Sequence, residues 1–521
     1  MSFAKVYSAQ ASLLRAHIVS VEADTAKGLH AFTVVGLPDK AVEESRDRVS
    51  AAIKNSGWKP PKQRNQKITI SLAPADLKKE GPAFDLPIAL AFLLSEEEIA
   101  FDPEGKLFIG ELALDGVLKP VRGALSIAKE AKKRGFTELY VPRENAEEAA
   151  FVGGITVFPV ESLFAVIDHL RKPPKDLLIP QPKRITPQPK TLLPRCEGNE
   201  ESPFADIRGQ ETAKRGQEIA AAGGHNILLY GPPGTGKTML ARALASILPQ
   251  LTENEALEVT AIHSVSGLAK GSIISEAPFR SPHHTASYVS VIGGGATPKP
   301  GEATLAHRGV LFLDEFPEFD KRVIESLREP LEEGSVSIAR AKGTEHFPAQ
   351  FVLVAAMNPC PCGFHGDKTK ACECPPGALQ KYQRKISGPI LDRIDMMIEV
   401  PRLAHEKLSG KQKDGGAYAK KAMEKILSAR AHQQKRFAGG THPERLNGHM
   451  SVRDLDRLVP LSESVKKKLN EVAASLDLSA RAYHRIIKLA RTIADLDESR
   501  FVEEKHLLEA LQYRPKKLFT Q

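Results

Sequence analysis

The glycine-rich stretch GPPGTGKT, residues 231–238, constrains the fold of this chain more than any other segment. It fits the pattern G-x-x-x-x-G-K-[ST], and it lies between HNILLY, which predicts a strand, and MLARALASIL, which predicts a helix. In this setting backbone N–H groups wrap phosphates at a helix N-terminus, and Lys237 can reach the β- and γ-phosphates. We therefore predict an α/β fold with a nucleoside triphosphate site formed by Gly231, Pro232, Pro233, Gly234, Thr235, Gly236, Lys237 and Thr238.

The apolar run VLFLDE, residues 310–315, predicts a second strand that ends in two carboxylates. Asp314 is predicted to hold Mg²⁺ together with the Thr238 hydroxyl, because Mg²⁺ prefers oxygen ligands. Glu315 is predicted to be the general base that polarises the attacking water. Asn358 ends the next apolar run, FVLVAAMNP, and is predicted to orient that water. The sequence thus predicts ATP hydrolysis with Mg²⁺ as cofactor.

Composition places the chain among ordinary soluble proteins, since 41% of its 521 residues are hydrophobic and 26% are charged. The N-terminal segment lacks the charged-then-apolar pattern of a signal peptide, and the longest apolar stretch, 87–94, is far too short to cross a bilayer. Cysteines number only five. We therefore expect a cytoplasmic protein with no membrane segment and no structural disulfides.

Proline marks a domain boundary. The stretch 171–195 has a proline every few residues and no apolar periodicity, which predicts an extended linker. Before it, short β-rich runs alternate with helical segments, and near the C-terminus the patterns are helical throughout. We predict an α/β multidomain protein with a front domain at 1–170, a linker at 171–203, an ATPase core at 204–403, and a basic connector with a helical lid at 404–521.

The net charge of +9 is concentrated in two segments. Residues 171–195 and residues 406–445 each carry an excess of six positive charges, which leaves the rest of the chain at −3. Concentrated basic charge favours a polyanion such as nucleic acid as a partner. Solvated, lysine-rich connecting segments are the alternative interpretation.

Four of the five cysteines are crowded into NPCPCGFHGDKTKACEC, residues 358–374, within a predicted insertion at 358–376. Four thiolates suit a tetrahedral Zn²⁺ ion, and the loop between the two Cys-x-Cys pairs is long enough to close the site. The predicted ligands are Cys360, Cys362, Cys372 and Cys374, with His365 as a possible substitute. An iron–sulfur cluster and the absence of any metal remain the alternatives.

In this order, the motifs resemble those of AAA+ ATPases. GPILDRIDMMIEVP, residues 388–401, resembles the segment that carries an arginine finger in that class, which would be Arg393. LSARAYHRIIKLARTIADL, residues 478–496, resembles the lid helix with the second sensor, which would be Arg481. An arginine finger acts on the ATP of a neighbouring subunit, so the resemblance implies a homo-oligomeric ring, usually a hexamer. A structural salt bridge is the alternative role for both arginines.

The resemblance can be narrowed to one branch. The long spacing between Lys237 and Asp314 leaves room for an insertion around 281–295, and residues 332–351 predict a β-hairpin. Both features are similar to the magnesium-chelatase and MCM branch, in which such elements project into a central pore. VVGLPDKAVEESRDRV, LREPLEEG and MNPCPCG resemble the YifB/ComM family over essentially the whole chain.

The front domain is similar to the proteolytic domain of Lon, which has a ribosomal S5 domain 2-like fold. LKKEGPAFDLPIAL, residues 77–90, resembles the segment with the serine nucleophile, and the position of that serine holds Ala83. The positions where the partner lysine would stand hold Leu125 and Ile127. A Ser–Lys dyad needs a hydroxyl and an amine, so we predict a scaffold without peptidase activity.

The YifB/ComM resemblance implies an ATP-driven motor acting on DNA. The implied activity is helicase or branch migration on recombination intermediates during natural transformation, with single-stranded or branched DNA as partner. Arg280, Arg340 and Lys342 lie beside the predicted insertion and hairpin and are candidate phosphate contacts, with solvated surface charge as the alternative. The alternatives for function are an ATP-dependent protein-remodelling chaperone and a chelatase-type ATPase.

Overall fold

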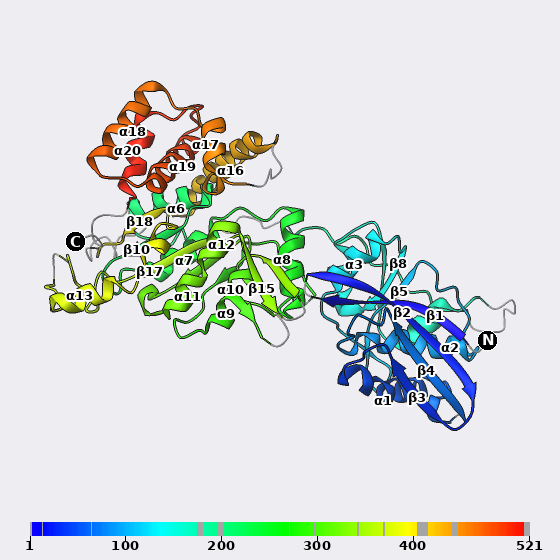
Figure 1. Ribbon diagram of the computed structural model, residues 1–521. Coiled ribbons are helices and arrows are strands. Elements are labelled where there is room, and N and C mark those ends of the chain that lie inside the picture. Colours follow the sequence, from blue (N-terminus) through cyan, green and yellow to red (C-terminus); the bar gives the residue numbers. More distant parts are fainter. Residues whose placement is uncertain are drawn as a thin grey trace. The chain divides into compact units, whose positions relative to one another are not determined.

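The structure is a computed structural model (Figure 1). The chain forms two compact units, Met1–Arg195 with Thr252–Ser275, and Cys196–Leu251 with Glu276–Gln521. Thr252–Ser275 thus folds with the front of the chain, although it lies within the predicted ATPase core at 204–403. The residues that the structure describes are 3–12, 14–63, 65–173, 181–194, 202–269, 271–295, 299–340, 343–367, 370–403, 415–439 and 445–514.

The first unit is built on a seven-stranded mixed sheet with the strand order β3-β4-β2-β1-β5-β8-β9. The pairs β1·β2 and β2·β4 are antiparallel, and the other neighbours are parallel. Alternate residues of β4 are buried, as expected of a strand with one face on a core. The strands are β1 (Phe3–Ser12), β2 (Arg15–Lys27), β3 (Ala31–Val35), β4 (Gln66–Ala73), β5 (Lys106–Phe108), β8 (Glu138–Pro142) and β9 (Thr156–Val160), and β6 (Glu111–Leu112) pairs with β7 (Leu118–Lys119) in a small hairpin.

The helices of this unit are α1 (Lys40–Asn55), α2 (Asp85–Ser95), α3 (Ala124–Lys133), α4 (Ala146–Ala150), α5 (Leu163–Leu170) and α8 (Glu253–Val265). The helix α2 is apolar on almost every side and is buried along nearly its whole length, which makes it the centre of the core. Asp39 caps the N-terminus of α1, because its carboxylate accepts a hydrogen bond from the N–H of Val42 at 2.9 Å.

Helix α8 shows how a segment of the ATPase sequence joins the first unit. It packs against α3, and the Ser264 hydroxyl of α8 accepts a hydrogen bond from the N–H of Gly123 at 3.0 Å. Burial raises the pKa of Glu148, which lies beside Ser264 and accepts from the N–H of Leu125. The contacts of Ser264 with Gly123 and Glu148 have no local signal in the sequence, because they join residues more than a hundred positions apart.

Part of the predicted linker is fastened to the first unit. The N–H of Gln188 donates to the carbonyl of Val157 in β9 at 2.8 Å, and the Thr191 hydroxyl donates to the carbonyl of Glu147 at 2.7 Å. Residues 181–194 therefore contact the edge strand β9 and the segment around Glu147 of this unit. The flanking residues 174–180 and 195–201 of the predicted linker lie outside the described residues.

The second unit contains a five-stranded sheet in which all neighbours are parallel, with the order β11-β14-β17-β10-β18. All residues of β10, β14 and β17 are buried, which explains why they read as unbroken apolar runs. The strands are β11 (Phe279–Arg280), β14 (Val310–Leu313), β17 (Val352–Met357), β10 (Ile227–Tyr230) and β18 (Met396–Glu399), and the predicted hairpin is confirmed as β15 (Ser335–Arg340) with β16 (Gly343–Pro348).

Near the predicted insertion, β12 (Gly293–Gly294) pairs with β13 (Lys299–Pro300). Helices surround the five-stranded sheet. These helices are α6 (Glu211–Gly223), α7 (Lys237–Ser246), α9 (Tyr288–Ile292), α10 (Glu302–Leu305), α11 (Lys321–Ser326), α12 (Arg328–Glu333), α13 (Pro376–Gln383) and α14 (Gly388–Leu391). Among the described residues, the short 3-10 helices are Pro61–Gln63, Pro82–Phe84, Arg143–Asn145, Phe316–Glu318 and Asn447–His449.

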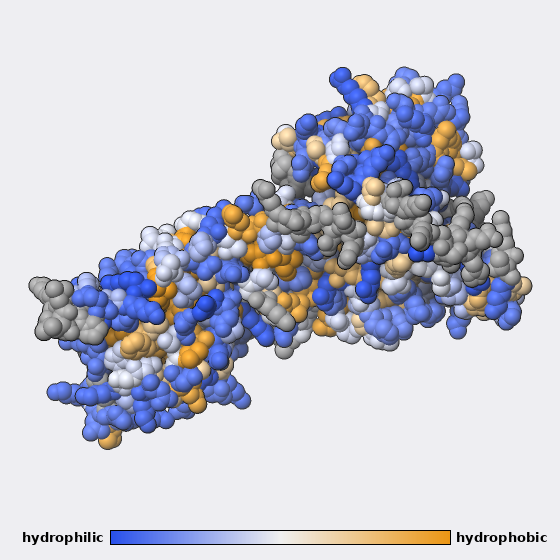
Figure 2. All heavy atoms as spheres, turned by 180° about the vertical axis from the view of Figure 1, so that it is seen from behind, coloured by the Kyte–Doolittle hydropathy of each residue, from blue (hydrophilic) through white to orange (hydrophobic). Residues whose placement is uncertain are grey.

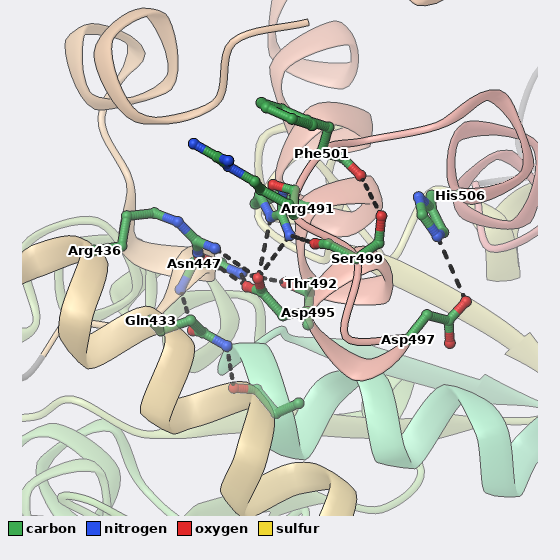
Figure 3. A network of polar contacts seen from close by, with 12 residues as sticks. Gln433, Arg436, Asn447, Arg491, Thr492, Asp495, Asp497, Ser499, Phe501 and His506 are labelled. Atoms are coloured by element: carbon green, nitrogen blue, oxygen red, sulfur yellow. Dashed lines mark hydrogen bonds and ion pairs between the residues drawn. The ribbon is translucent and has the colours of Figure 1, made fainter.

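The C-terminal region is helical, as predicted, and comprises α16 (Gly415–Phe437), α17 (Val452–Leu458), α18 (Glu463–Ser475), α19 (Ala480–Leu496) and α20 (Glu504–Gln512). Helices α16 and α19 pack against each other and against α6 of the ATPase core. Their contact encloses a polar network centred on Asp495 (Figure 3). A single hydrophobic core runs continuously through this helical region and the ATPase core.

The face of the molecule in Figure 2 is largely hydrophilic, and its apolar residues lie in small patches. Over the described part of the chain, no helix combines the length and the apolarity that a bilayer span requires. The architecture is therefore a multidomain α/β protein with parallel strands and a C-terminal helical region. The likeness of the front domain to Lon stays a prediction.

Candidate nucleotide and metal sites

The glycine-rich loop joins the end of β10 to the start of α7, as the motif predicted. Two positions of this loop require glycine for structural reasons. A Cβ at Gly231 would meet the carbonyl oxygen of Val400 at 2.2 Å, so only glycine allows that approach of two backbones. Gly236, the residue before α7, has a φ of 86°, which L-residues with side chains rarely adopt. The loop thus presents the N-terminus of α7 at the carboxyl end of the sheet.

Lys237 lies where it can serve a bound phosphate. Its Nζ donates to the carbonyls of Gly231 and Pro232 at 2.8 and 2.9 Å and to Oδ1 of Asn358 at 3.1 Å. Asn358 reaches it because β10 and β17 are parallel neighbours, so their carboxyl ends meet at one edge. Burial lowers the pKa of Lys237. These acceptors hold the ammonium group at the mouth of the loop.

Thr238 and Asp314 come together from α7 and the end of β14. The Thr238 hydroxyl donates to Oδ2 of Asp314 at 2.7 Å. A hydroxyl and a carboxylate in contact form the pair of oxygen ligands that Mg²⁺ takes beside a nucleotide, so the residues present fit that ion. Glu315 follows in the left-handed region, with a φ of 51°, and its N–H donates to Oδ1 of Asp314 at 2.9 Å.

The contact that Glu315 makes was not predicted. Its Oε2 lies 3.1 Å from Nδ1 of His284, a residue of the predicted insertion at 281–295. The pair His283–His284 just after β11 is a weak local signal for this contact. Histidine pairs are common on solvated loops, and only the sheet order brings this one beside the carboxylate.

The two predicted arginines lie together in a second site. Arg393 is buried, ion-paired with Glu332, and donates from Nη1 to the carbonyl of Pro389 at 2.5 Å. Arg481 lies 3.6 Å from Oδ2 of Asp392. Both line a cleft of about 530 Å³ in the second unit, together with Arg485 and Lys488. Burial lowers the pKa of Lys488.

This cleft is not lined by residues 231–238. Within a single chain, the structure therefore gathers Arg393 and Arg481 but does not bring them to the glycine-rich loop. The salt-bridge role that the sequence left open applies to both arginines within one chain.

The four cysteines of the insertion converge, with Cys360 buried. The sulfur of Cys360 lies 3.3 Å from that of Cys362 and 3.7 Å from that of Cys372, and the sulfurs of Cys362 and Cys372 lie 3.6 Å apart. Tetrahedral Zn²⁺ with Zn–S bonds of about 2.3 Å has sulfurs roughly 3.8 Å apart, so these residues fit zinc. A backbone hydrogen bond from Phe364 lowers the pKa of the Cys362 thiol to about 6, which favours the thiolate that binds metal.

His365 is not one of the converging ligands. Its backbone N–H instead donates to the sulfur of Cys360 at 3.3 Å, and the N–H of Cys362 donates to the sulfur of Cys374 at 3.4 Å. Hydrogen bonds of this kind stabilise sulfur ligands from outside the metal shell.

The cysteine loop also touches the nucleotide loop. Gly363 has a φ of 85°, and a Cβ there would meet Cδ of Pro233 at 2.6 Å. The two loops are therefore in direct van der Waals contact, which the sequence did not indicate. A folded cysteine loop supports one side of the glycine-rich loop.

Some residues of the candidate DNA-binding segments make contacts within their own chain. Arg280 donates from Nε and Nη2 to the carboxylate of Glu302 at 2.6 and 2.8 Å, so this arginine is engaged in its own chain. In the basic segment 406–445, Arg430 donates to the carbonyl of Ala221 and Arg436 pairs with Asp495, so part of that charge is structural. Lys342 and the Arg340 side chain lie outside the described residues.

A parallel sheet, a glycine-rich loop before a helix, and adjoining Thr238 and Asp314 define a nucleotide-binding protein of the P-loop class. The family model described as magnesium chelatase, subunit ChlI matches residues 203–408, and the model for the C-terminal part of that subunit matches 417–514. A further model, described as subunit ChlI of Mg-chelatase, matches 21–145.

Full-length relatives narrow the class. The chain is 41% identical to the uncharacterized protein YifB of Escherichia coli over 517 residues, covering 99% of this chain and 97% of that one. It is 40% identical to competence protein ComM of Haemophilus influenzae over 521 residues, covering 99% and 98%. The magnesium-chelatase 38 kDa subunit of Rhodobacter capsulatus is 28% identical over 175 residues, which is 30% of this chain and 50% of that one. The chain belongs to the YifB/ComM family of magnesium-chelatase-like AAA+ ATPases.

Proposed function

We propose that this protein is an ATP-hydrolysing ring motor that acts on DNA, with branch migration or helicase activity on recombination intermediates during natural transformation. The observation that carries the proposal is end-to-end similarity to a relative named competence protein ComM, joined to an intact nucleotide site. The magnesium-chelatase 38 kDa subunit of Rhodobacter capsulatus aligns with 30% of this chain, whereas competence protein ComM aligns with 99% of it, and this difference favours the DNA motor over a chelatase-type ATPase.

In this proposal the nucleotide site works with ATP and Mg²⁺. Lys237 holds the β- and γ-phosphates, while Thr238 and Asp314 hold Mg²⁺. Glu315 takes the proton of the attacking water, and Asn358 orients that water. The contact between Lys237 and Asn358 supports these roles, because both groups lie at the edge of the sheet where the γ-phosphate would lie.

The ring itself is part of the proposal. Arg393 and Arg481 share a cleft that residues 231–238 do not line. We propose that this cleft faces the ATP of a neighbouring subunit in a homo-oligomeric ring, such as a hexamer, and that the arginines stabilise charge on its γ-phosphate. Zn²⁺ held by the four cysteines is the proposed structural metal of each subunit.

The test compares ATP turnover with and without single-stranded or forked DNA at low salt, followed by strand displacement on a synthetic four-way junction. We expect DNA to raise the rate of ATP turnover, and we expect the four-way junction to be separated into duplex products, without strand cleavage, in the presence of ATP. Lys237→Ala should abolish turnover, and Glu315→Gln should retain ATP binding but stall hydrolysis. Lys381→Ala, an exposed lysine on α13, is the matched control and should behave as the native protein.

Absence of DNA binding and of stimulation at low salt would contradict the DNA proposal and favour the protein-remodelling alternative. Normal turnover in Glu315→Gln would contradict the assignment of the base.

A further inference from the structure

Two lysine side chains end over one turn of the first unit, formed by Gly153 and Gly154. A Cβ at Gly154 would meet Nζ of Lys132 at 3.1 Å. A Cβ at Gly153 would meet Cε of Lys190 at 3.3 Å. Lys132 belongs to α3, whereas Lys190 belongs to the basic segment 171–195. The fold thus brings a cation of that basic segment to a cation of the front domain.

Both lysines lack an acidic partner in the described part of the chain. Their side chains are exposed, and neither forms an ion pair there. Arg134, two residues beyond Lys132, is by contrast paired with Glu130 at 2.8 Å. Two ammonium groups over one turn repel each other, and an anion between them would be attracted to both. The pair is therefore a candidate anion site.

The turn itself offers backbone donors. The N–H of Gly153 donates to the carbonyl of Ala150 at 3.3 Å. The N–H groups of Gly154 and Ile155 have no acceptor among the residues that the structure describes. Gly153 and Gly154 have positive φ angles, of 61° and 76°, and successive N–H groups in turns are common anion-binding sites. Unpaired N–H groups beside two ammonium groups suit a phosphate, which accepts several hydrogen bonds at once.

Lys190 is held at this turn by the segment that carries it. On one side of it, the N–H of Gln188 donates to the carbonyl of Val157 at 2.8 Å. On the other side, the Thr191 hydroxyl donates to the carbonyl of Glu147 at 2.7 Å. The chain is thus anchored within two residues of Lys190 in both directions. An anchored backbone has less freedom to lose when the lysine binds a phosphate.

A third lysine favours a polymer over a single phosphate group. Lys183 is exposed, has no acidic partner for its side chain among the described residues, and donates from its backbone N–H to Asp168 at 2.6 Å. It lies seven residues before Lys190 in the same basic segment. The separate anchors keep the two lysines apart along the chain, so a polymer with repeated phosphates can meet both.

We propose that Lys132, Lys190 and the turn at Gly153 and Gly154 bind a backbone phosphate of DNA. This inference rests on the proposed function, in which DNA is the partner, and it adds a DNA contact within the first unit. Contacts with phosphate carry no base information, so binding at this turn should not depend on the base sequence.

The test measures binding of a fluorescent single-stranded oligonucleotide by the full-length protein between about 50 and 200 mM salt. Lys132→Ala combined with Lys190→Ala should weaken binding about tenfold at the lower salt concentration, because two cations that contact phosphate are lost. The slope of log K against log salt should become shallower by about 1.4, or about 0.7 for each lost contact. Lys132→Arg combined with Lys190→Arg keeps both charges and should bind as the native protein does.

Lys54→Ala combined with Lys59→Ala is the matched control, because it removes two exposed positive charges from the same unit at the end of α1. It should leave the affinity and the slope unchanged. An equal loss in this control would overturn the inference, since any two charges would then serve. Native affinity in the alanine pair at 132 and 190 would also overturn it, and so would weaker binding with an unchanged slope.

A free phosphate ion offers the same chemistry as a backbone phosphate, so the binding measurement is repeated with low-millimolar inorganic phosphate at constant ionic strength. We expect the difference between the native protein and the alanine pair to persist. Loss of that difference would assign the turn to free phosphate and overturn DNA as its ligand.

These outcomes separate the inference from the function on which it rests. If the native protein neither binds DNA nor responds to it, the proposed function fails, and DNA as the ligand of this turn fails with it. If the native protein binds DNA and DNA raises ATP turnover, but the alanine pair behaves in the same way, only the inference fails.

Discussion

Asp495 of α19 joins three parts of the C-terminal region through its carboxylate (Figure 3). It accepts hydrogen bonds from Arg436 of α16 at 2.5 and 2.9 Å, from Arg491 at 2.8 and 3.1 Å, and from the Asn447 amide at 2.8 Å. The carboxylate is only 2% exposed, so its charge depends on these partners. Two guanidinium groups in turn depend on this one carboxylate.

Asp495→Ala should therefore destabilise the C-terminal region strongly. It leaves two guanidinium groups unpaired in a largely buried site, and breaking a buried ion pair in this way costs about 3–5 kcal/mol. The measurement is the thermal midpoint together with the rate of proteolysis within α16–α20. Asp456→Ala, at an exposed position of the helix α17, is the control and should change neither. An unchanged midpoint for Asp495→Ala would show that the network contributes nothing to stability.

At the scale of elements, the cysteine loop between β17 and α13 supports the glycine-rich loop. Cys360 lies three residues beyond the end of β17, and Gly363 touches Pro233. A metal that fixes the cysteine loop would therefore also fix one side of the nucleotide loop. Metal binding and support of the nucleotide loop can therefore be separated by mutation, because the cysteines bind the metal whereas Gly363 makes the contact with the nucleotide loop.

Purified protein should contain one zinc per chain by elemental analysis, and Cys372→Ser should lose most of it and bind ATP more weakly. Gly363→Ala should keep the zinc but still weaken ATP binding, because its Cβ displaces Pro233 and the φ of 85° is strained. Gly366→Ala is the control for a glycine of similar φ with open space around its Cβ position. A zinc-free, colourless and fully active protein would refute the metal site.

At the scale of the whole molecule, the arginine cleft makes the assembly testable. If Arg481 serves a neighbouring subunit, Glu315→Gln and Arg481→Ala subunits have complementary defects. Each variant alone should be nearly inactive, whereas an equal mixture that exchanges subunits should recover about a quarter of the native turnover, since one interface in four then has both groups intact. The measurement is the ATPase rate across mixing ratios. A mixture no more active than its components would place Arg481 on its own chain's nucleotide.

Much of the candidate site could be predicted from sequence because it is local. The residues 231–238 lie between a strand and a helix, and that setting alone indicates a phosphate loop. The parallel strands are buried on both sides, so they appear as apolar runs, and residues at their ends, such as Asp314 and Asn358, meet at one edge of the sheet. The four cysteines are close in sequence, so a short loop suffices to gather them.

What only the tertiary structure decided depends on contacts between distant residues that carry no local pattern. The packing of Thr252–Ser275 with the first unit comes from buried polar contacts such as that between Ser264 and Gly123. The approach of His284 to Glu315 comes from the order of the strands, and that of Gly363 to Pro233 from two loops meeting at one edge. The sequence by itself determined which groups this protein has for ATP and for a metal. The tertiary structure decided which of these groups touch, because contact depends on how separate elements pack and not on their spacing along the chain.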